Sequence, residues 1–317
     1  MRQSSRPAAD SSLAQTLSPR RRRQRCGTIL LMVASLLVLR FNLTRRLLLL
    51  PPLPRLIWIT SKHPGSSWKN DTIIKTWSDL NPTYKIVHHS DAEAEQFMCS
   101  TDFFHNHEVS NQTLCQVYQS LPLPVMKADM WRYAVMYKHG GVYADANALC
   151  RVPIDEWNLD RQCAFWAGQE NNRLLCQWTL AALPGHELYG RTLQLIQKRV
   201  QRCIEQHGTV SRCLAAGSSV HQLTGPAVFT DAVLQGLKPW VPATGIAKFD
   251  KWTTTWRLRL AAALFTVDVC IAPQRHIRHS PREGFHDGFV YNRLDLGAGS
   301  DDGWMAQVKA IIERGHR

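Results

Sequence analysis

A helix that passes directly into a short strand is the feature that most constrains the fold of this chain. Apolar residues recur at steps of three and four through residues 124–139, which is the spacing of an amphipathic helix. Gly140 and Gly141 follow, and glycine accepts the left-handed backbone of a helix end. Residues 142–144 are then predicted to form a strand, and Asp145 follows at its carboxyl end. Because ligands of open α/β sheets bind at that edge, the segment predicts both a fold class and a site.

Apolar strands and amphipathic helices alternate through the rest of the globular part. The pattern predicts strands at 56–59 and 84–87, and helices at 70–80, 92–98 and 188–204. Alternation of this kind is typical of a parallel α/β sheet covered by helices. The length of 317 residues allows one large α/β domain or two small ones.

The positive charge of the chain is concentrated at its N-terminus. Residues 1–46 contain ten arginines and one acidic residue, whereas the whole chain has a net charge of +13. The remaining residues show no basic stripe interleaved with aromatics and no zinc-finger spacing. We therefore expect no nucleic-acid partner.

A cluster of arginines that ends at Arg25 is followed by an apolar run, which predicts a membrane anchor. Positive residues before such a run are held on the cytoplasmic side. We expect a cytoplasmic basic tail (1–25), a signal-anchor transmembrane segment (26–40), a stem (41–54) and a lumenal domain (55–317). A cleaved signal peptide or a mitochondrial presequence would also place basic residues before an apolar run. The long basic region and the lack of a clear small-x-small cleavage site favour the anchor.

Nine cysteines are spread along the chain, and eight of them follow the expected anchor. An even number suits an oxidising, lumenal compartment, and no C-x-x-C pair of the zinc-binding kind occurs. The pairs closest in sequence, Cys99 with Cys115 and Cys203 with Cys213, are the predicted disulfides.

The tripeptide Asp145-Ala146-Asn147 is a candidate metal site. Two oxygen-bearing side chains, two residues apart at a strand end, can point to the same side. Hard divalent cations take oxygen ligands and share them with substrate phosphates. An Asx-turn after a strand explains the same three residues, and for the tripeptide alone it is the simpler interpretation.

Asp129 and Arg132 lie three residues apart on the predicted helix, so they share a face. An intrahelical salt bridge is the ordinary explanation of such a pair. The functional interpretation is that Arg132 positions Asp145 and the phosphates or sugar of a donor. Asp129 would then accept hydrogen bonds from sugar hydroxyls.

The stretch 127–145, KADMWRYAVMYKHGGVYAD, resembles the DXD region of glycosyltransferase family 32. Fungal initiation-specific α-1,6-mannosyltransferases are the members that it resembles most. The similarity covers roughly residues 54–304, and further similar stretches follow in the expected order at 58–60, 80–82, 153–157, 176–179, 185–186, 224–231 and 299–300.

This resemblance implies a GT-A-like fold, in which a Rossmann-related mixed sheet is flanked by helices. It implies a metal-dependent retaining glycosyltransferase, an α-mannosyltransferase that uses GDP-mannose and Mn²⁺ in the synthesis of an N-glycan outer chain or a glycolipid. The implied location is the Golgi membrane, as a single-pass type II protein with a lumenal catalytic domain. The implied partners are a nucleotide sugar, a glycan or glycolipid acceptor, the membrane and other Golgi glycosyltransferases.

Carried over position by position, the resemblance assigns roles to individual residues. Those assigned to catalysis are Asp129, Arg132 and Asp145. Those assigned to donor binding are Trp58, Asp129, Arg132, Tyr143 and Asp145. Trp58 would lie near the nucleoside, although a tryptophan in a first strand fits the core equally well. Those assigned to the metal are Asp145, Asn147 and Asp295.

The sequence departs from the family pattern at two metal positions. Asn147 offers a neutral amide oxygen where the family has the second aspartate of its DXD motif. Asp295 stands where the family has a metal-binding histidine, and it, Asp301 or Asp302 could restore the lost charge. Two alternative hypotheses follow: a catalytically weakened Golgi binding subunit, or the same fold with another donor such as UDP-galactose.

Overall fold

The computed structural model describes residues 50–60, 71–103, 113–157, 159, 163–171, 173–237, 269–272, 277–278, 290–292 and 304–315. The expected basic tail, anchor and most of the stem lie outside these residues, as does Asp295. Within the described ranges, no helix combines the length and the hydropathy needed to cross a bilayer.

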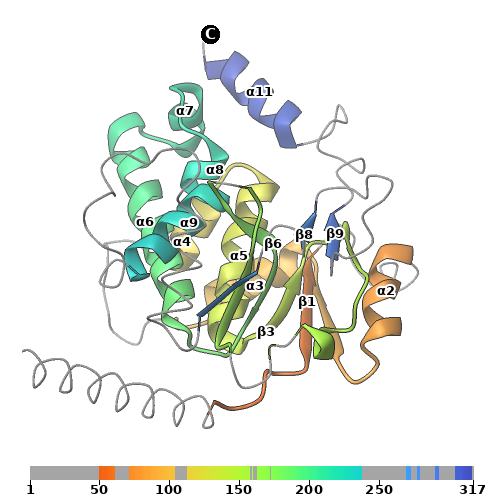
Figure 1. The fold of residues 1–317 in the computed structure, drawn as a ribbon. Helices are drawn as coiled ribbons and strands as arrows, with labels where there is room; N and C mark the ends of the chain where they lie inside the picture. Colours follow the sequence, from red (N-terminus) through yellow and green to blue (C-terminus); the bar gives the residue numbers. More distant parts are fainter. Residues whose placement is uncertain are drawn as a thin grey trace, which may run out of the picture. The chain divides into compact units, whose positions relative to one another are not determined.

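A mixed sheet of six strands, in the order β2-β1-β3-β6-β5-β7, forms the centre of the fold (Figure 1). β1 is parallel to β2 and β3, whereas β6 is antiparallel to β3 and β5. The fully parallel sheet expected from the alternation is therefore wrong, because the chain reverses direction between β3 and β6. The mixed α/β sheet flanked by helices is confirmed. Its strands are β1 (Leu56–Thr60), β2 (Lys85–His89), β3 (Gly141–Ala144), β5 (Phe165–Gln169), β6 (Leu175–Ala182) and β7 (Val269–Ala272).

The first strand of a second, three-stranded sheet begins directly after Asn147. It has the order β4-β9-β8 and contains β4 (Ala148–Cys150), β8 (Ile277–Arg278) and β9 (Val290–Asn292). β4 and β9 are antiparallel, and Ala148 lies opposite Asn292. The end of β9 is therefore beside the turn that contains Asn147.

Several helices of the described residues begin at a residue whose side chain caps the first turn. Asp71 caps α2 by accepting hydrogen bonds from two backbone N–H groups of its first turn. Ser90 and Thr113 form reciprocal capping boxes at the starts of α3 and α4. The helices are α2 (Thr72–Leu80), α3 (Asp91–Ser100), α4 (Leu114–Ser120), α5 (Pro124–His139), α6 (Glu187–His207), α7 (Val210–Ala215), α8 (Val220–Leu223), α9 (Pro226–Leu237) and α11 (Trp304–Gly315), with a 3₁₀ helix, η2, at Ile154–Glu156.

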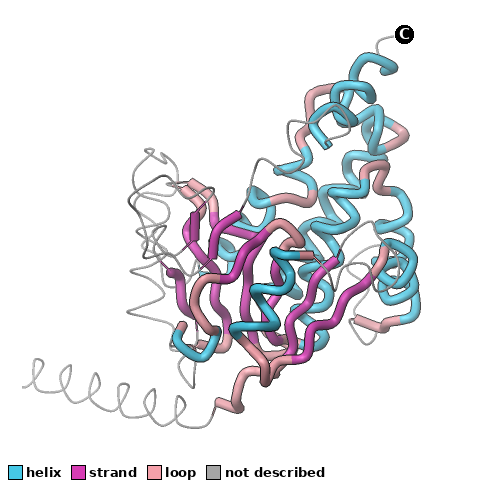
Figure 2. Tube along the Cα trace, turned by 90° about the vertical axis from the view of Figure 1, so that its right-hand side faces the viewer, coloured by secondary structure: helices cyan, strands magenta, loops and turns pink. Residues whose placement is uncertain are grey.

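The two faces of the six-stranded sheet pack into separate apolar cores. On one face Ile57 and Ile59 pack with Trp77 of α2. On the other face Trp58 packs with Trp131 of α5 in a core that also includes α6 and α9. Successive residues of a strand point to opposite faces, so β1 contributes to both cores. Helix α2 thus covers one face, and the larger group of helices covers the other (Figure 1, and Figure 2 after a 90° turn).

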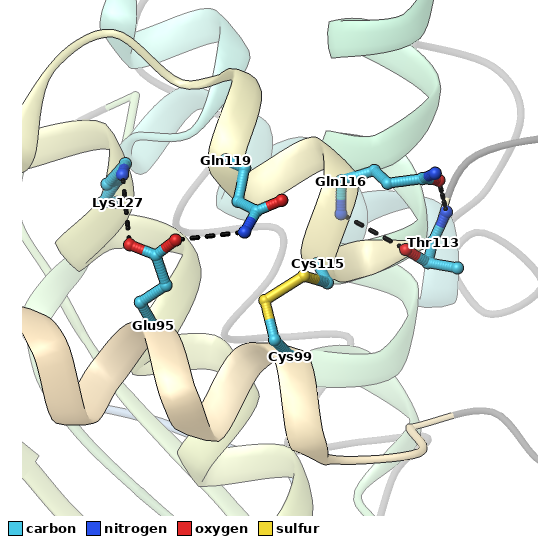
Figure 3. Close-up of a disulfide and its surroundings, with 7 residues drawn as sticks. All are labelled: Glu95, Cys99, Thr113, Cys115, Gln116, Gln119 and Lys127. Carbon is cyan, nitrogen blue, oxygen red and sulfur yellow. Dashed lines mark hydrogen bonds and ion pairs between the residues drawn. A yellow bond between two sulfur atoms is a disulfide. The ribbon is translucent and has the colours of Figure 1, made fainter.

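Three disulfides connect elements of the described region. Figure 3 shows the bond between Cys99 and Cys115, which joins α3 to α4. The second predicted pair, Cys203 with Cys213, joins α6 to α7 and is also confirmed. The third bond, Cys163–Cys270, spans 107 residues and joins the segment before β5 to β7. The sequence did not predict this last pair, because its partners meet only once β5 and β7 are side by side.

Removing the Cys163–Cys270 bond is expected to destabilise the fold more than removing the Cys203–Cys213 bond. In the chain-entropy description a disulfide restricts the unfolded chain more when it closes a longer loop, about 4.7 kcal/mol for ~100 residues and about 3 kcal/mol for ~15. The two bonds have sequence separations of 107 and 10. Urea unfolding of the two double Cys→Ser variants measures the difference, and equal losses would contradict this expectation.

Candidate functional site

The two glycines after α5 fix the path of the chain into the site. Gly140 ends the helix with φ 63°, and Gly141 begins β3 with φ 92°. A Cβ atom on Gly140 would lie 2.5 Å from the carbonyl oxygen of Ala182, and one on Gly141 would lie 2.6 Å from that of Leu56. Only glycine combines this backbone with such close packing. The predicted passage from helix to strand is therefore confirmed.

Asp145 follows β3 at its carboxyl end, as the sequence predicted. Its N–H donates to the carbonyl of Trp178 at 2.9 Å, and its own carbonyl accepts the N–H of Ala148 at 2.9 Å. The turn that contains Asn147 is thus closed by a backbone carbonyl, whereas an Asx-turn would use the carboxylate. The Tyr143 hydroxyl donates to Asp145 Oδ1 at 2.5 Å. The carboxylate is 26% exposed, so a ligand can reach it.

Arg132 connects the helix to the end of the strand. Its Nη2 lies 3.1 Å from Asp129 Oδ1 and 3.3 Å from Asp145 Oδ1, and its guanidinium stacks over the Tyr143 ring at 5.0 Å. The side chains of Arg132 and Asp129 are only 4% and 1% exposed. Their pairing is therefore a buried feature and not the ordinary surface salt bridge. The Nε and Nη1 groups of Arg132 have no hydrogen-bond partner among the residues that the structure describes.

Asp129 has both carboxylate oxygens bonded by protein donors. Gln177 Nε2 donates to Oδ1 at 3.0 Å, and Thr224 Oγ1 donates to Oδ2 at 2.9 Å. The Tyr133 hydroxyl in turn donates to the side-chain oxygen of Gln177. The predicted role of Asp129 as an acceptor from sugar hydroxyls stays a prediction, because the described contacts of its oxygens are to protein donors. In this structure the carboxylate orients Arg132.

Burial and charge act together on the two groups. Burial raises the pKa of the Asp129 carboxyl to about 6, while Arg132 and the Thr224 hydroxyl lower it. Burial lowers the pKa of the Arg132 guanidinium, but the opposite charges of Asp145 and Asp129 outweigh it and the net direction is upward. Arg132 is therefore a permanent positive charge in a place from which water is largely excluded.

Trp58 lies in the core between β1 and α5, and it is only 5% exposed. Its indole N–H donates to the Gly140 carbonyl at 2.8 Å, and its ring stacks on His139 at 5.1 Å. A cavity of about 290 Å³ opens nearby, at the carboxyl end of β1. Its lining includes Thr60 of β1 and Ala128, which precedes Asp129 on α5.

The predicted metal ligands are only partly brought together in the described residues. Asp145 and Asn147 provide two oxygen donors in one turn, and Asp145 Oδ2 accepts no hydrogen bond from a described residue. No group of three or more His, Cys, Asp or Glu that could hold a metal occurs within the described ranges. Asp295 lies outside them but follows Asn292, the partner of Ala148, by three residues in the sequence. Oxygen donors of this kind fit Mn²⁺ or Mg²⁺.

A known protein family matches the part of the chain that contains most of the site residues. Residues 67–164 match the family described as "Glycosyltransferase sugar-binding region containing DXD motif". This segment is therefore similar to that family. It contains four of the residues that meet in the site, namely Asp129, Arg132, Tyr143 and Asp145, together with Asn147.

Two fungal relatives are similar over longer stretches than this region. The initiation-specific alpha-1,6-mannosyltransferase of Schizosaccharomyces pombe is 29% identical over 202 residues, which cover 58% of this chain and 49% of the relative. The enzyme of the same name from Candida albicans is 25% identical over 296 residues, covering 80% and 73%. The chain thus spans about half the length of the first relative. The resemblance expected from the sequence is confirmed.

Two further proteins are similar, one over a shorter stretch of sequence and the other at a lower identity. Inositol phosphoceramide mannosyltransferase 1 of Schizosaccharomyces pombe is 28% identical over 147 residues, which cover 45% of this chain and 44% of the relative. Among solved structures, PaToxG Glycosyltransferase aligns with a TM-score of 0.45 at 16% identity, over 74% of this chain and 88% of that chain.

Two residues of the site were not predicted from the sequence. Gln177 and Thr224 hold Asp129 but lie beyond the matched residues 67–164, 48 and 95 residues away from Asp129 in the chain. Their only sequence signal was that each lies in a stretch similar to family 32, at 176–179 and 224–231.

Proposed function

We propose that the chain is a metal-dependent retaining glycosyltransferase that transfers mannose from GDP-mannose to a glycan or glycolipid hydroxyl. The observation that carries this proposal is Arg132. It is a buried cation with two N–H groups that no described residue bonds, and it pairs with Asp145 at the exposed end of β3. The similarity to fungal mannosyltransferases supports mannose as the sugar and the GT-A-like description of the fold.

The leaving group of this reaction is a nucleoside diphosphate, on which negative charge develops as the glycosidic bond breaks. A fixed positive charge in a site with little water stabilises that charge more than the same group would in water. Arg132 meets this need, because Asp129 and the Tyr143 ring hold its guanidinium in place. Asp145 then remains to contact the metal, the ribose or the sugar.

Mn²⁺ would be held by Asp145, Asn147 and Asp295. When bound, the ion supplies further positive charge to the diphosphate. Asp145 contributes the carboxylate that is 26% exposed, and Asn147 contributes an amide oxygen from the same turn. The pairing of Ala148 with Asn292 supports Asp295 as the third ligand, because it brings the chain segment before Asp295 to this turn.

Retention of configuration in a single displacement, without a covalent intermediate, requires the acceptor hydroxyl to attack the anomeric carbon on the face from which the phosphate departs. We propose that the hydroxyl proton passes to the departing phosphate oxygen, so that no side chain forms a covalent intermediate. The occupancy of Asp129 supports this, because protein donors bond both of its oxygens. The cavity beside Thr60 and Ala128 is our proposed place for the nucleoside, next to the helix that carries Arg132.

A donor screen tests this function. The purified lumenal domain is incubated with GDP-mannose, UDP-galactose and other nucleotide sugars, each with and without Mn²⁺, and release of the nucleoside diphosphate is measured. We expect Mn²⁺-dependent release from GDP-mannose above all other donors. Release from a different donor would replace mannose in the proposal, and no release from any donor would remove transferase activity.

The alternative function, a Golgi binding subunit without catalysis, is favoured by Asn147. A neutral amide in place of a carboxylate weakens a site for a hard cation. In that case the donor screen shows no turnover, although the protein still binds a nucleoside diphosphate.

We also propose the location that the sequence predicts, a single-pass type II protein of the Golgi membrane with its catalytic domain in the lumen. The clustered arginines before residue 26 and the three disulfides of the globular part support it. Complexes with other Golgi glycosyltransferases belong to the same proposal. Protease treatment of sealed microsomes is the test: digestion of the C-terminal domain without detergent would exclude this orientation.

A further inference from the structure

We propose that Gln177 and Thr224 are positioning residues, which hold the Asp129 carboxylate as a fixed acceptor and thereby aim Arg132 at the diphosphate of the donor. This inference rests on the proposed function for the identity of the ligand. Neither residue lies in the matched sugar-binding region, and neither contacts Arg132 or Asp145 in the hydrogen bonds of the described residues.

The first step of the argument is geometric. A carboxylate can rotate about its terminal torsion, so a single contact with Arg132 would leave its direction open. Gln177 fixes Oδ1 from β6, and Thr224 fixes Oδ2 from the junction of α8 and α9. Because two elements bond the two oxygens, the plane of the Asp129 carboxylate is set before any ligand binds.

The second step is that Gln177 is itself held in one orientation. Its side-chain oxygen accepts the hydrogen bond of the Tyr133 hydroxyl, which leaves its NH₂ group to face Asp129. Tyr133 is buried on the same helix as Asp129 and Arg132. The two hydrogen-bond partners of the Gln177 side chain, Tyr133 and Asp129, therefore both belong to α5. The side chain of Gln177 therefore connects β6 to α5 by two hydrogen bonds at the site.

The third step concerns Thr224, which follows the short helix α8. The carbonyl of Gln222 in α8 accepts a hydrogen bond from Arg199 of α6 at 2.7 Å, and Arg199 also pairs with Asp231 of α9. These contacts hold α8 between two longer helices. Thr224, which directly follows α8, is therefore held in place with its hydroxyl toward Asp129, and it is fully buried.

The consequence for Arg132 follows from its contacts. Its Nη2 bonds both Asp129 and Asp145, so a rotation of the Asp129 carboxylate would move the guanidinium away from the end of β3. The two N–H groups without a described partner would then no longer point where the site needs them. Loss of either supporting hydrogen bond should weaken the binding of a diphosphate even though neither residue touches it.

The test measures the binding of GDP and of UDP by calorimetry, with Mn²⁺ present, alongside mannose transfer. The variants are Thr224→Val, which keeps the shape but removes the hydroxyl, Thr224→Ser, which keeps the hydroxyl, and Gln177→Met. We expect Thr224→Val and Gln177→Met to weaken nucleotide binding by about 10- to 100-fold, as for loss of a hydrogen bond to a charged group. Thr224→Ser should bind like the wild type.

Thr192→Val is the matched control. Thr192 is also fully buried, but among the described residues its hydroxyl bonds just the Leu188 carbonyl of its own helix, so nucleotide binding should not change. Melting temperatures of all variants show whether each is folded. If Thr224→Val does not fold, Gln177→Met and Thr224→Ser decide the matter.

The inference is overturned if Thr224→Val and Gln177→Met bind as the wild type does. It is also overturned if Thr224→Ser loses as much affinity as Thr224→Val, because the packing and not the hydroxyl would then matter. A wild type that binds neither nucleotide overturns both this inference and the proposed function. If the binding series is as expected but no sugar is transferred, only the proposed function fails.

Discussion

Replacing Arg132 with lysine is expected to lower kcat/KM for sugar transfer by about 100- to 1000-fold, the size seen when one preorganised donor to a developing negative charge is lost. Lysine keeps the charge, but it lacks the planar guanidinium, which stacks on Tyr143 while its Nη2 contacts Asp129 and Asp145 and its Nε and Nη1 stay available to a ligand. The leaving diphosphate would then meet a positive charge in the wrong place. Steady-state kinetics with the best donor of the screen measures the effect.

Arg191→Lys is the control for this experiment. Arg191 pairs with Glu187 one helical turn away, but the pair is exposed and lies on α6, outside the site. Its substitution should leave kcat/KM unchanged, since exposed pairs contribute little. A folded Arg132→Lys protein with the kinetics of the wild type would show that Arg132 serves only the fold.

The burial of the pair explains why lysine is a better choice than alanine. The sequence alone predicts that Asp129→Ala and Arg132→Ala abolish transfer and leave the fold intact. Arg132→Ala leaves the Asp129 carboxylate, which is 1% exposed, as an uncompensated buried charge, and this costs about 3–5 kcal/mol. Asp129→Ala leaves the buried guanidinium with Asp145 as its remaining charged partner. Loss of activity in the alanine variants would therefore not separate a role in the reaction from a role in folding.

Local patterns were sufficient to predict the part of the site that is close in sequence. The helical spacing of 124–139, the two glycines and the strand that ends at Asp145 all involve neighbours along the chain, and each is confirmed. The face shared by Asp129 and Arg132 follows from the helical repeat in the same way.

The sequence did not predict the strands β5 and β6, because their residues are largely buried. In β6 all residues except Gln177 are buried, so the sequence shows no alternation of polar and apolar side chains. A short apolar run of this kind is distinguished as a strand only by its partners, and here those are β3 and β5. The contribution of Gln177 to the site was hidden for the same reason.

Burial was the other property that the sequence left open. Trp58 could be assigned near a nucleoside from the resemblance, whereas the structure places its indole N–H on the Gly140 carbonyl inside the core. Nor does the sequence show that Thr224, 95 residues away, bonds one of the oxygens of Asp129. Contacts between residues so distant in the chain depend on how the junction of α8 and α9 meets α5 and are not encoded in any local pattern.

Removing the carboxylate of Asp295 is expected to abolish nearly all transfer, because Asn147 leaves the proposed metal site with one negative charge fewer than the family pattern. The two remaining described donors are the carboxylate of Asp145 and the amide oxygen of Asn147. Affinity for a hard cation rises with the number of charged ligands. Asn147→Asp should therefore lower the Mn²⁺ concentration for half-maximal activity by about tenfold, and it should partly rescue Asp295→Ala.

Four proteins, each titrated with Mn²⁺, separate the possible roles of the metal: the wild type, Asn147→Asp, Asp295→Ala and the double variant. If Asp295 compensates for Asn147, the wild type and the double variant respond to Mn²⁺, whereas Asp295→Ala alone does not. If the protein is a binding subunit, the wild type shows no transfer, and Asn147→Asp alone gains hydrolysis of the donor. Activity that resists a chelator and is unchanged by either substitution would remove the metal from the mechanism, and Arg132 would then carry the charge of the leaving diphosphate alone.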